Sequence, residues 1–289
     1  MEEQDRSCEY LSGVGPVWCP GCGYYGILSA LVEAFADLGL PTNELALISG
    51  IGCSSRLPYF VKAYGFHSIH GRGLPIAQGV KTANPELTVL AVGGDGDGLA
   101  IGGGHLPHIA RNNVDITYLL FNNAIYGMTK GQFSPTTVLF PITKTSPFGL
   151  AGESVNPCAL AIVYGASFVA RGFSVKKEHL KDLIIQGIEH RGFSFIEILA
   201  SCSSFNTTDM NVARIINNLQ MVPEDHNPED EIEALRLATD KEKINLGVLV
   251  RNPRPTLGDK FQEVQKKAKA KAPEAKAQAA MEDLLAQFA

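Results

Sequence analysis

The stretch from Val89 to Asn123 constrains this chain more than any other part of the sequence. A short apolar run, LTVLAV, leads straight into the glycine-rich GGDGDG at residues 93–98. Residues 99–112 have helical character, and a second apolar run at 116–121 ends in Asn122-Asn123. Two buried strands joined by a helix form a right-handed βαβ unit. The sequence therefore predicts an α/β fold with a mostly parallel sheet.

Polar residues follow both strands of this unit. Asp95 comes directly after the first strand and Asn123 directly after the second, and ligands in such folds bind at the carboxyl ends of the strands. The Asp95 carboxylate, the Asn123 amide oxygen and the backbone carbonyl of Ile125 are hard oxygen ligands of the kind that Mg²⁺ prefers. Free N–H groups at a helix start near Gly98 would favour a diphosphate. A glycine-rich turn capped by an aspartate is the alternative, and the Asn-Asn pair favours the ligand site.

The motifs GDGDG at 94–98 and FNNAIYGMT at 121–129 resemble the thiamine diphosphate signature. They are most similar to the β subunits of 2-oxoacid:ferredoxin oxidoreductases, in particular the 2-oxoglutarate type, and the similarity covers roughly residues 17–206. The resemblance implies a PP-type thiamine diphosphate-binding domain with helices on both faces of the sheet. In these motifs it implies cofactor binding by Gly94, Asp95, Gly96, Asp97, Asn123, Ile125, Gly127, Met128 and Thr129, with Mg²⁺ held by Asp95, Asn123 and Ile125.

Six cysteines lie at positions 8, 19, 22, 53, 158 and 202. Read alone, the CxxC motif in WCPGC suits zinc, a thiol–disulfide pair or an iron–sulfur cluster. The motifs WCPGC, GIGCS and C-x-x-F-N match the family's ligands of one [4Fe–4S] cluster, which the resemblance assigns to Cys19, Cys22, Cys53 and Cys202. Cys8 and Cys158 match no family ligand, and we interpret them as ordinary thiols.

Two more strands are expected to end in glycine-rich turns at the same edge of the sheet. One, at 45–49, precedes Cys53, Ser54 and Arg56, and the other runs from Phe66 toward His70. Ser54 is included among the cofactor-binding residues. His70 could contact a phosphate or the thiazolium ring, or it could be a core histidine bonded to a backbone carbonyl. Arg56 is our candidate for binding a distal substrate carboxylate through a bidentate pair, with a surface arginine as the alternative.

The rest of the chain continues the alternation of helices and strands. Helices are expected at 24–38, 74–84 and 175–190, strands at 167–170 and 193–199, and a further helix and strand at 231–241 and 246–250. A long loop at 126–147 covers the cofactor in the family. We expect residues 1–210 to form the thiamine diphosphate- and iron–sulfur-binding domain. Residues 211–289 are expected to be a C-terminal extension that contacts another subunit.

Composition narrows the class of protein. The formal net charge of −5 argues against binding to nucleic acid. No apolar run approaches the length that spans a bilayer, and the acidic, polar MEEQDRSCEY does not resemble a signal peptide. A soluble cytoplasmic protein is expected, without disulfides.

The resemblance also implies an activity. A 2-oxoacid is decarboxylated with CoA to an acyl-CoA and CO₂, reversibly in principle, and electrons pass through the [4Fe–4S] cluster to ferredoxin. The 2-oxoglutarate reaction, which gives succinyl-CoA, is favoured over pyruvate or branched-chain 2-oxoacids. The family takes an essential carboxylate from a pyrimidine-binding domain, so we expect a partner α subunit and a dimer of αβ pairs. A zinc-stapled module that holds a nucleotide is the alternative from another class.

Overall fold

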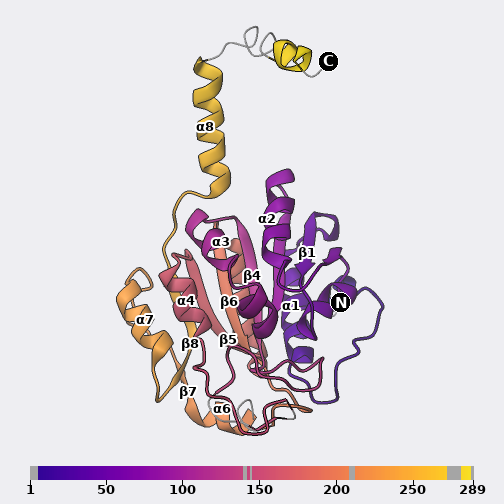
Figure 1. Cartoon of the computed structure of the whole chain (residues 1–289), viewed down its shortest axis with the longest axis vertical. Coiled ribbons are helices and arrows are strands. Elements are labelled where there is room, and N and C mark those ends of the chain that lie inside the picture. The colour runs from indigo at the N-terminus through magenta and orange to yellow at the C-terminus, as the bar shows by residue number, and fades with distance from the viewer. Residues whose placement is uncertain (1–5, 139–141, 144, 208–211, 272–280, 288–289) are drawn as a thin grey trace, which may run out of the picture.

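A computed structural model describes residues 6–138, 142–143, 145–207, 212–271 and 281–287. Its centre is one eight-stranded sheet with the order β2-β1-β3-β4-β6-β5-β8-β7 (Figure 1). Neighbouring strands are parallel, apart from the antiparallel pair of β5 and β8. The strands are β1 (Leu45–Ser49), β2 (Tyr64–His67), β3 (Thr88–Gly94), β4 (Ile116–Asn122), β5 (Phe168–Phe173), β6 (Phe193–Leu199), β7 (Leu219–Met221) and β8 (Ile244–Arg251).

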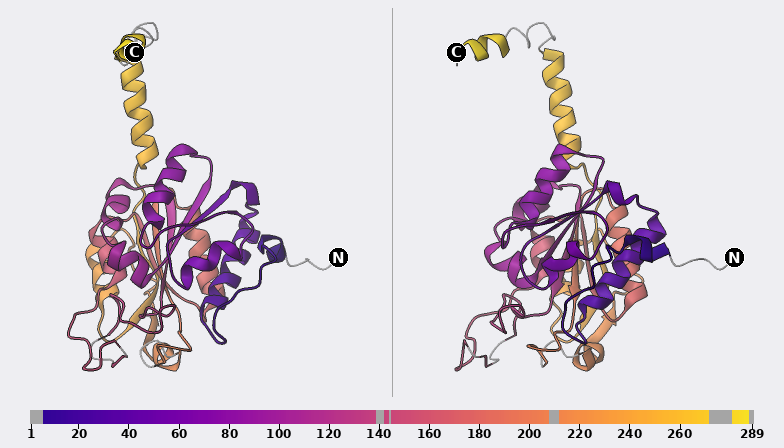
Figure 2. Two further views of the ribbon diagram at one scale, coloured as in Figure 1. Left: turned by 45° about the vertical axis from the view of Figure 1, so that its right-hand side comes forward. Right: turned by 90° about the vertical axis from the view of Figure 1, so that its right-hand side faces the viewer.

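Helices cover both faces of this sheet, as Figures 1 and 2 show. They are α1 (Tyr24–Leu38), α2 (Gly73–Ala83), α3 (Leu106–Asn112), α4 (Pro157–Val163), α5 (Lys177–Glu189), α6 (Val212–Asn218), α7 (Glu231–Thr239) and α8 (Leu257–Lys271). Along β1, Leu45 and Leu47 pack with α1 and α5, whereas Ala46 and Ile48 pack with α2 and α3. Alternate residues of the strand thus pack into hydrophobic cores on opposite faces of the sheet. The core on the second face also includes residues of α4 and α7. The predicted mostly parallel α/β fold is confirmed.

Two local predictions near the glycine-rich turns were wrong. The single helix expected over 99–112 is a π-helical turn, Asp97–Ile101, followed by turns and then the short α3. Glycines at 102–104 disfavour a continuous helix, and packing is tight here, because a Cβ on Gly71 would lie 2.5 Å from the Gly102 nitrogen. The strand expected to run to His70 ends at His67, so His70 lies in the turn that follows.

The carboxyl ends of β1, β3, β4 and β6 lie at one edge of the sheet, the lower edge in Figure 1. The loops after these strands carry most of the predicted site residues, whereas His70 follows β2 and Cys19 and Cys22 precede α1. The helix α8 leaves from the opposite edge and projects from the body, and residues 260–270 are exposed. In the part of the chain that is described, no helix is both long enough and apolar enough to cross a membrane.

The residues after 211 contribute to the same sheet. The strand expected at 246–250 is β8, and α7 packs against α4 on the second face. The expected domain boundary between residues 210 and 211 lies outside the described residues, so the division into two domains stays a prediction.

Asn113 gives a test of this packing. It is fully buried with a left-handed φ of 54°, its Nδ2 donates to the Arg254 carbonyl oxygen, and its Oδ1 accepts from Phe193 N and Ser167 Oγ. We expect Asn113→Ala to lower the free energy of unfolding by about 2–4 kcal/mol, because buried partners lose their bonds. Urea unfolding would measure this. The control is Asn112→Ala, whose side chain makes no hydrogen bond within the described structure, and equal midpoints for the two variants would contradict the role of Asn113.

Candidate active site

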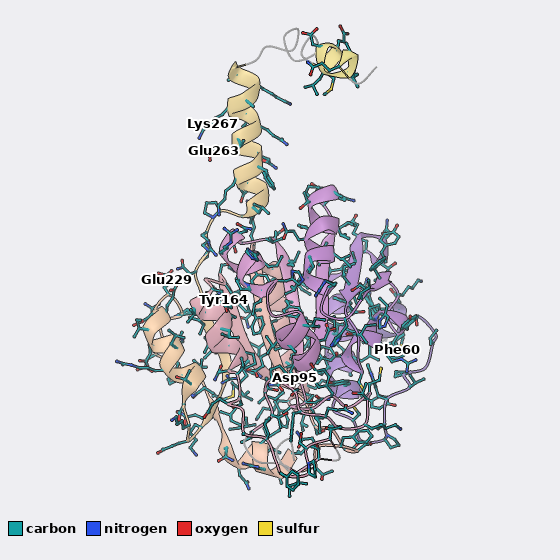
Figure 3. The ribbon with its side chains drawn as sticks, viewed as in Figure 1. Phe60, Asp95, Tyr164, Glu229, Glu263 and Lys267 are labelled. Atoms are coloured by element: carbon teal, nitrogen blue, oxygen red, sulfur yellow. The ribbon has the colours of Figure 1, made fainter. Side chains whose placement is uncertain are left out.

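A cavity of about 410 Å³ opens at the carboxyl ends of β1, β3 and β4. Figure 3 labels Asp95 at this edge of the sheet. The predicted site residues that line the cavity are Cys53, Ser54, His70, Gly94, Asp95, Gly96, Asp97, Asn123, Ile125, Gly127, Met128 and Thr129. Residues not predicted also line it, namely Tyr24, Ile51, Gly52, Tyr126 and Gln132. Most of the predicted set is therefore gathered around one space.

Strand register brings Asp95 and Asn123 together. Gly94 pairs with Phe121 in the parallel β3–β4 ladder, so the residues that follow the two strands emerge side by side. Asp95 and Asn123 are both buried. Asn123 Oδ1 accepts a hydrogen bond from Ile125 N at 3.2 Å, and this local bond shapes the turn after β4. Three oxygen donors, from Asp95, Asn123 and Ile125, are thus available on two adjacent turns.

The carboxylate of Asp95 lies in an unusual electrostatic environment. Burial raises the pKa of Asp95 to about 6, and hydrogen bonds from Ser134, Thr136 and the backbone of Asn123 lower it only in part. None of the ion pairs among the described residues includes Asp95. Because a buried carboxylate is costly without a positive partner, this site suits a metal ion. Its hard oxygen donors fit Mg²⁺.

Asp97 lines the cavity, and its carboxylate is held there by hydrogen bonds to the backbone of neighbouring loops. Its Oδ1 accepts from Ile51 N at 2.8 Å and from Gly71 N at 2.7 Å, and His70 Nδ1 lies 2.9 Å from the same oxygen. Burial raises the pKa of Asp97, and the Ile51 and Gly71 N–H groups oppose that shift. The carboxylate therefore joins the loops after β1 and β2 to the turn after β3. His70, with 36% of its side chain exposed, faces the cavity from this support.

Hydrogen bonds gather the three loops that carry the predicted cluster cysteines. These bonds run from Trp18 Nε1 to the Cys53 carbonyl oxygen (2.7 Å), from Gly23 N to the Ser201 carbonyl oxygen (3.0 Å) and from Ser203 Oγ to the Pro20 carbonyl oxygen (2.7 Å). The CxxC loop is therefore fixed against both the loop after β1 and the loop after β6.

The thiols themselves influence one another. Burial raises the pKa of Cys22 to about 11, and the thiols of Cys202, Cys53 and Cys19 add to that increase. A Cβ on Gly127 would lie 3.7 Å from Cys53 Sγ and 3.8 Å from Cys202 Sγ. Within the described residues, no three His, Cys, Asp or Glu side chains are close enough to hold a single metal ion. The four thiols are thus close enough to influence one another, and four thiolates are what a [4Fe–4S] cluster takes.

The remaining predicted residues lie apart from the cavity. Cys8 is exposed, whereas Cys158 is buried with its thiol 3.1 Å from Glu197 Oε2. Arg56 lies on the 3₁₀ helix Ser54–Tyr59, exposed and outside the cavity lining, where its charge lowers the pKa of Cys53 against the larger effect of burial.

Tyr126 and Tyr24 are the largest lining residues that sequence reasoning did not select. Tyr126 OH donates to the Gly96 carbonyl oxygen at 3.0 Å, and a Cβ on Gly96 would lie 2.3 Å from the Tyr126 ring. Tyr126 stands inside the NNAIYGMT motif, so the motif offered a signal. Tyr24 follows the CxxC motif at the start of α1 and is buried against Phe121. The sequence carried no comparable signal for its position.

Comparisons with known proteins agree with this geometry. The family model for the thiamine pyrophosphate enzyme, C-terminal TPP binding domain, matches residues 50–198. Subunit beta of 2-oxoacid:ferredoxin oxidoreductase 2 from Aeropyrum pernix is 44% identical over 198 residues, which are 68% of this chain. The chain belongs to the β subunits of the 2-oxoacid:ferredoxin oxidoreductases. The match covers 64% of the Aeropyrum subunit, slightly less than two thirds of its length.

Two further relatives place this β subunit within the family. The 2-oxoglutarate oxidoreductase subunit KorB of Mycobacterium tuberculosis is 46% identical over 213 residues, which cover 74% of this chain and 57% of that protein. A solved structure of the 2-oxoglutarate:ferredoxin oxidoreductase from Magnetococcus marinus, with 2-oxoglutarate, coenzyme A and succinyl-CoA bound, superposes with a TM-score of 0.89. It is 41% identical, and the match covers 93% of this chain and 92% of that one.

The raised pKa of Asp95 predicts a trade-off between stability and metal binding. Because the folded-state pKa lies near 6 rather than 3.8, the metal-free β subunit should lose stability as pH rises from about 4 to about 6. At pH 7.5, Asp95→Asn should therefore raise the free energy of unfolding of the metal-free chain by about 2–3 kcal/mol. Urea unfolding with and without Mg²⁺ and thiamine diphosphate measures both effects. A variant that is less stable than the wild type, or that these ligands still stabilise, would contradict this reading of Asp95.

Proposed function

We propose that this β subunit works with an α subunit to oxidise a 2-oxoacid, 2-oxoglutarate above others, with CoA as acceptor of the acyl group and ferredoxin as acceptor of electrons. The observation that carries the proposal is the buried Asp95 carboxylate, which has no cationic partner among the described residues and lies beside the oxygen donors of Asn123 and Ile125. The Magnetococcus marinus relative, determined with 2-oxoglutarate, coenzyme A and succinyl-CoA bound, supports the choice of substrate class.

The cofactor site follows from the two turns. Asp95, Asn123 Oδ1 and the Ile125 carbonyl would hold Mg²⁺, and N–H groups of the glycine-rich turn at 94–98 would contact the diphosphate. Thiamine diphosphate, when bound, supplies the electron sink for loss of CO₂. The other lining residues would shape the space around it, and His70, which lines the same cavity, would contact the cofactor. The cofactor-contacting set also includes Ser54, Gly94, Gly96, Asp97, Gly127, Met128 and Thr129.

The electron path would begin next to this site. Cys19, Cys22, Cys53 and Cys202 would hold one [4Fe–4S] cluster. The position of a Cβ on Gly127 lies 3.7–3.8 Å from Cys53 Sγ, from Cys202 Sγ and from Asn123 Nδ2. A single glycine therefore separates two cluster thiols from the metal turn, which favours transfer of electrons from cofactor to cluster and then to ferredoxin.

Exposed apolar side chains surround the cavity mouth, which suits a subunit interface. Ile51 and Met128 line the cavity and are more than a third exposed, and Ile69, beside His70, is 75% exposed. Apolar groups gathered at a polar site are typical of surfaces that a partner covers. An α subunit docked there would complete the site with the carboxylate that this family takes from its pyrimidine-binding domain. A dimer of such αβ pairs follows the usual symmetry of soluble oligomers, and the C-terminal residues, α8 included, would provide further subunit contacts.

The cluster ligands can be tested by replacing single cysteines. We expect Cys202→Ala to lose most iron and acid-labile sulfide from anaerobically purified protein, because a [4Fe–4S] cluster needs four thiolates. Cys8→Ala is the matched control, since Cys8 is an exposed thiol outside the cluster loops, and it should retain the wild-type content. Full iron content in Cys202→Ala would refute this ligand, and zinc in place of iron in the wild type would favour the zinc-stapled module.

The reaction and the substrate can be tested in one set of assays. The αβ complex should reduce ferredoxin fastest with 2-oxoglutarate and CoA, more slowly with pyruvate or 2-oxoisovalerate, and the β subunit alone should not turn over. Although Arg56 lies outside the cavity lining, we propose that it reaches the distal carboxylate of the substrate. Arg56→Leu should then raise KM for 2-oxoglutarate about tenfold, because a charge-assisted pair is worth about 1.5–3 kcal/mol. The KM for pyruvate, which has no such carboxylate, should hardly change. Turnover by the β subunit alone would refute the shared site. Equal effects of Arg56→Leu on the KM values for 2-oxoglutarate and pyruvate would refute the role of Arg56.

A further inference from the structure

The side chain of Asn206 links the two halves of the site. It is buried, four residues beyond Cys202, and its Nδ2 donates to the Asn123 carbonyl oxygen at 3.1 Å and lies 3.4 Å from the Ala124 carbonyl oxygen. Cys202 and Asn206 also pair in an antiparallel bridge, which closes the loop between them. The loop with a predicted cluster ligand is thus bonded to the turn with two predicted metal ligands.

The loop at 202–206 is held from other sides as well. Ser203 Oγ donates to the Pro20 carbonyl oxygen, inside the CxxC motif. The ring of Phe205 packs beside Gly131, where an added Cβ would lie 3.4 Å from Phe205 Cδ1. The loop is therefore fixed to the CxxC segment, and the Asn206 bonds join it to the metal turn as well.

The metal turn is anchored independently by the sheet. Asn122 Nδ2 donates to Glu197 Oε1 at 2.7 Å, and Glu197 Oε2 accepts from Arg171 Nε at 2.7 Å, with all three residues buried. Among the hydrogen bonds of the described residues, those of Asn206 are the ones that join 202–206 to 122–125. The backbone bond from Ala200 N to the Asn122 carbonyl oxygen (2.9 Å) precedes the loop, so within 202–206 the Asn206 amide is the side-chain link to the metal turn.

We infer that Asn206 is a positioning residue that couples the iron–sulfur site to the metal–diphosphate site, an inference that rests on the proposed function. The amide holds the Cys202 loop against the Asn123 carbonyl, so ordering of either segment favours ordering of the other. Because binding free energies are reciprocal, occupancy of each site then stabilises the other by the same factor.

The test uses the αβ complex with its cluster and measures protection. The rate at which a chelator bleaches the visible absorption of the cluster is recorded with and without saturating Mg²⁺ and thiamine diphosphate. In the wild type we expect these ligands to slow bleaching about fivefold or more, because one buried hydrogen bond that couples the two sites is worth a factor of about this size. In Asn206→Ala the ratio should fall below about twofold. Ser204→Ala, an exposed position in the same loop, should keep the wild-type ratio.

A second variant keeps the inference open to refutation if Asn206→Ala binds too little cluster to measure. Asn206→Gln retains a donor on a longer side chain and should give a ratio between those of the wild type and the alanine variant. Wild-type protection in either variant would overturn the coupling while leaving the proposed function intact. A wild-type complex that binds no cluster or no thiamine diphosphate would overturn the proposed function, and the coupling with it.

Discussion

The burial of one carboxylate without a cation is the constraint on which the site depends. Asp95 follows a strand inside the sheet and is only 2% exposed, so its charge is poorly solvated. Such a group raises the free energy of the folded chain unless a positive ion reaches it. The remainder of the sheet, with two apolar cores, is what stabilises a turn that is locally unfavourable. The fold therefore holds the oxygens of the proposed cation site in place.

The second costly feature of the core is the buried ion pair of Arg171 and Glu197, which is bonded to Asn122 at the end of β4. Buried ion pairs stabilise little unless every remaining polar atom is bonded. Glu197 meets that requirement, because Oε1 accepts from Asn122 and Oε2 accepts from Arg171 and lies near the Cys158 thiol. Asn122 in turn accepts from Ala124 N at 3.0 Å, where Ala124 has a left-handed φ of 54°. The buried network thus maintains a backbone conformation that alanine rarely adopts, at the residue between two proposed metal ligands.

The sequence predicted those features of the fold that depend on the local pattern of apolar and polar residues. Period and composition predicted the central strands of the sheet, although β2 ends earlier than expected and the short β7 was not predicted. The residues just after β3 and β4 had to meet once the sheet was parallel. What it missed depends on partners distant in the chain. The break in the helix after Asp97 follows from close packing of Gly71 on Gly102, and the bonds of Asp97 reach Ile51 and Gly71 across two loops. The contact of Asn206 with Asn123 spans 83 positions, and although Asn206 ends the C-x-x-F-N motif, that motif does not indicate its partner.

Thr136, in the long loop after β4, contacts both the Asp95 carboxylate and the Asn122 amide. Its Oγ1 lies 2.7 Å from Asp95 Oδ2 and 2.9 Å from Asn122 Oδ1. Glu197 fixes the amide orientation of Asn122, because its carboxylate must face the Nδ2 donor, so both oxygens near Thr136 are acceptors. One hydroxyl proton cannot serve both while Asp95 is ionised. The proposed metal, by taking over the Asp95 charge, would leave that proton to Asn122. The bond from Thr136 to Asp95 would then give way to one from Thr136 to Asn122, at the start of the turn that carries the other two proposed metal ligands.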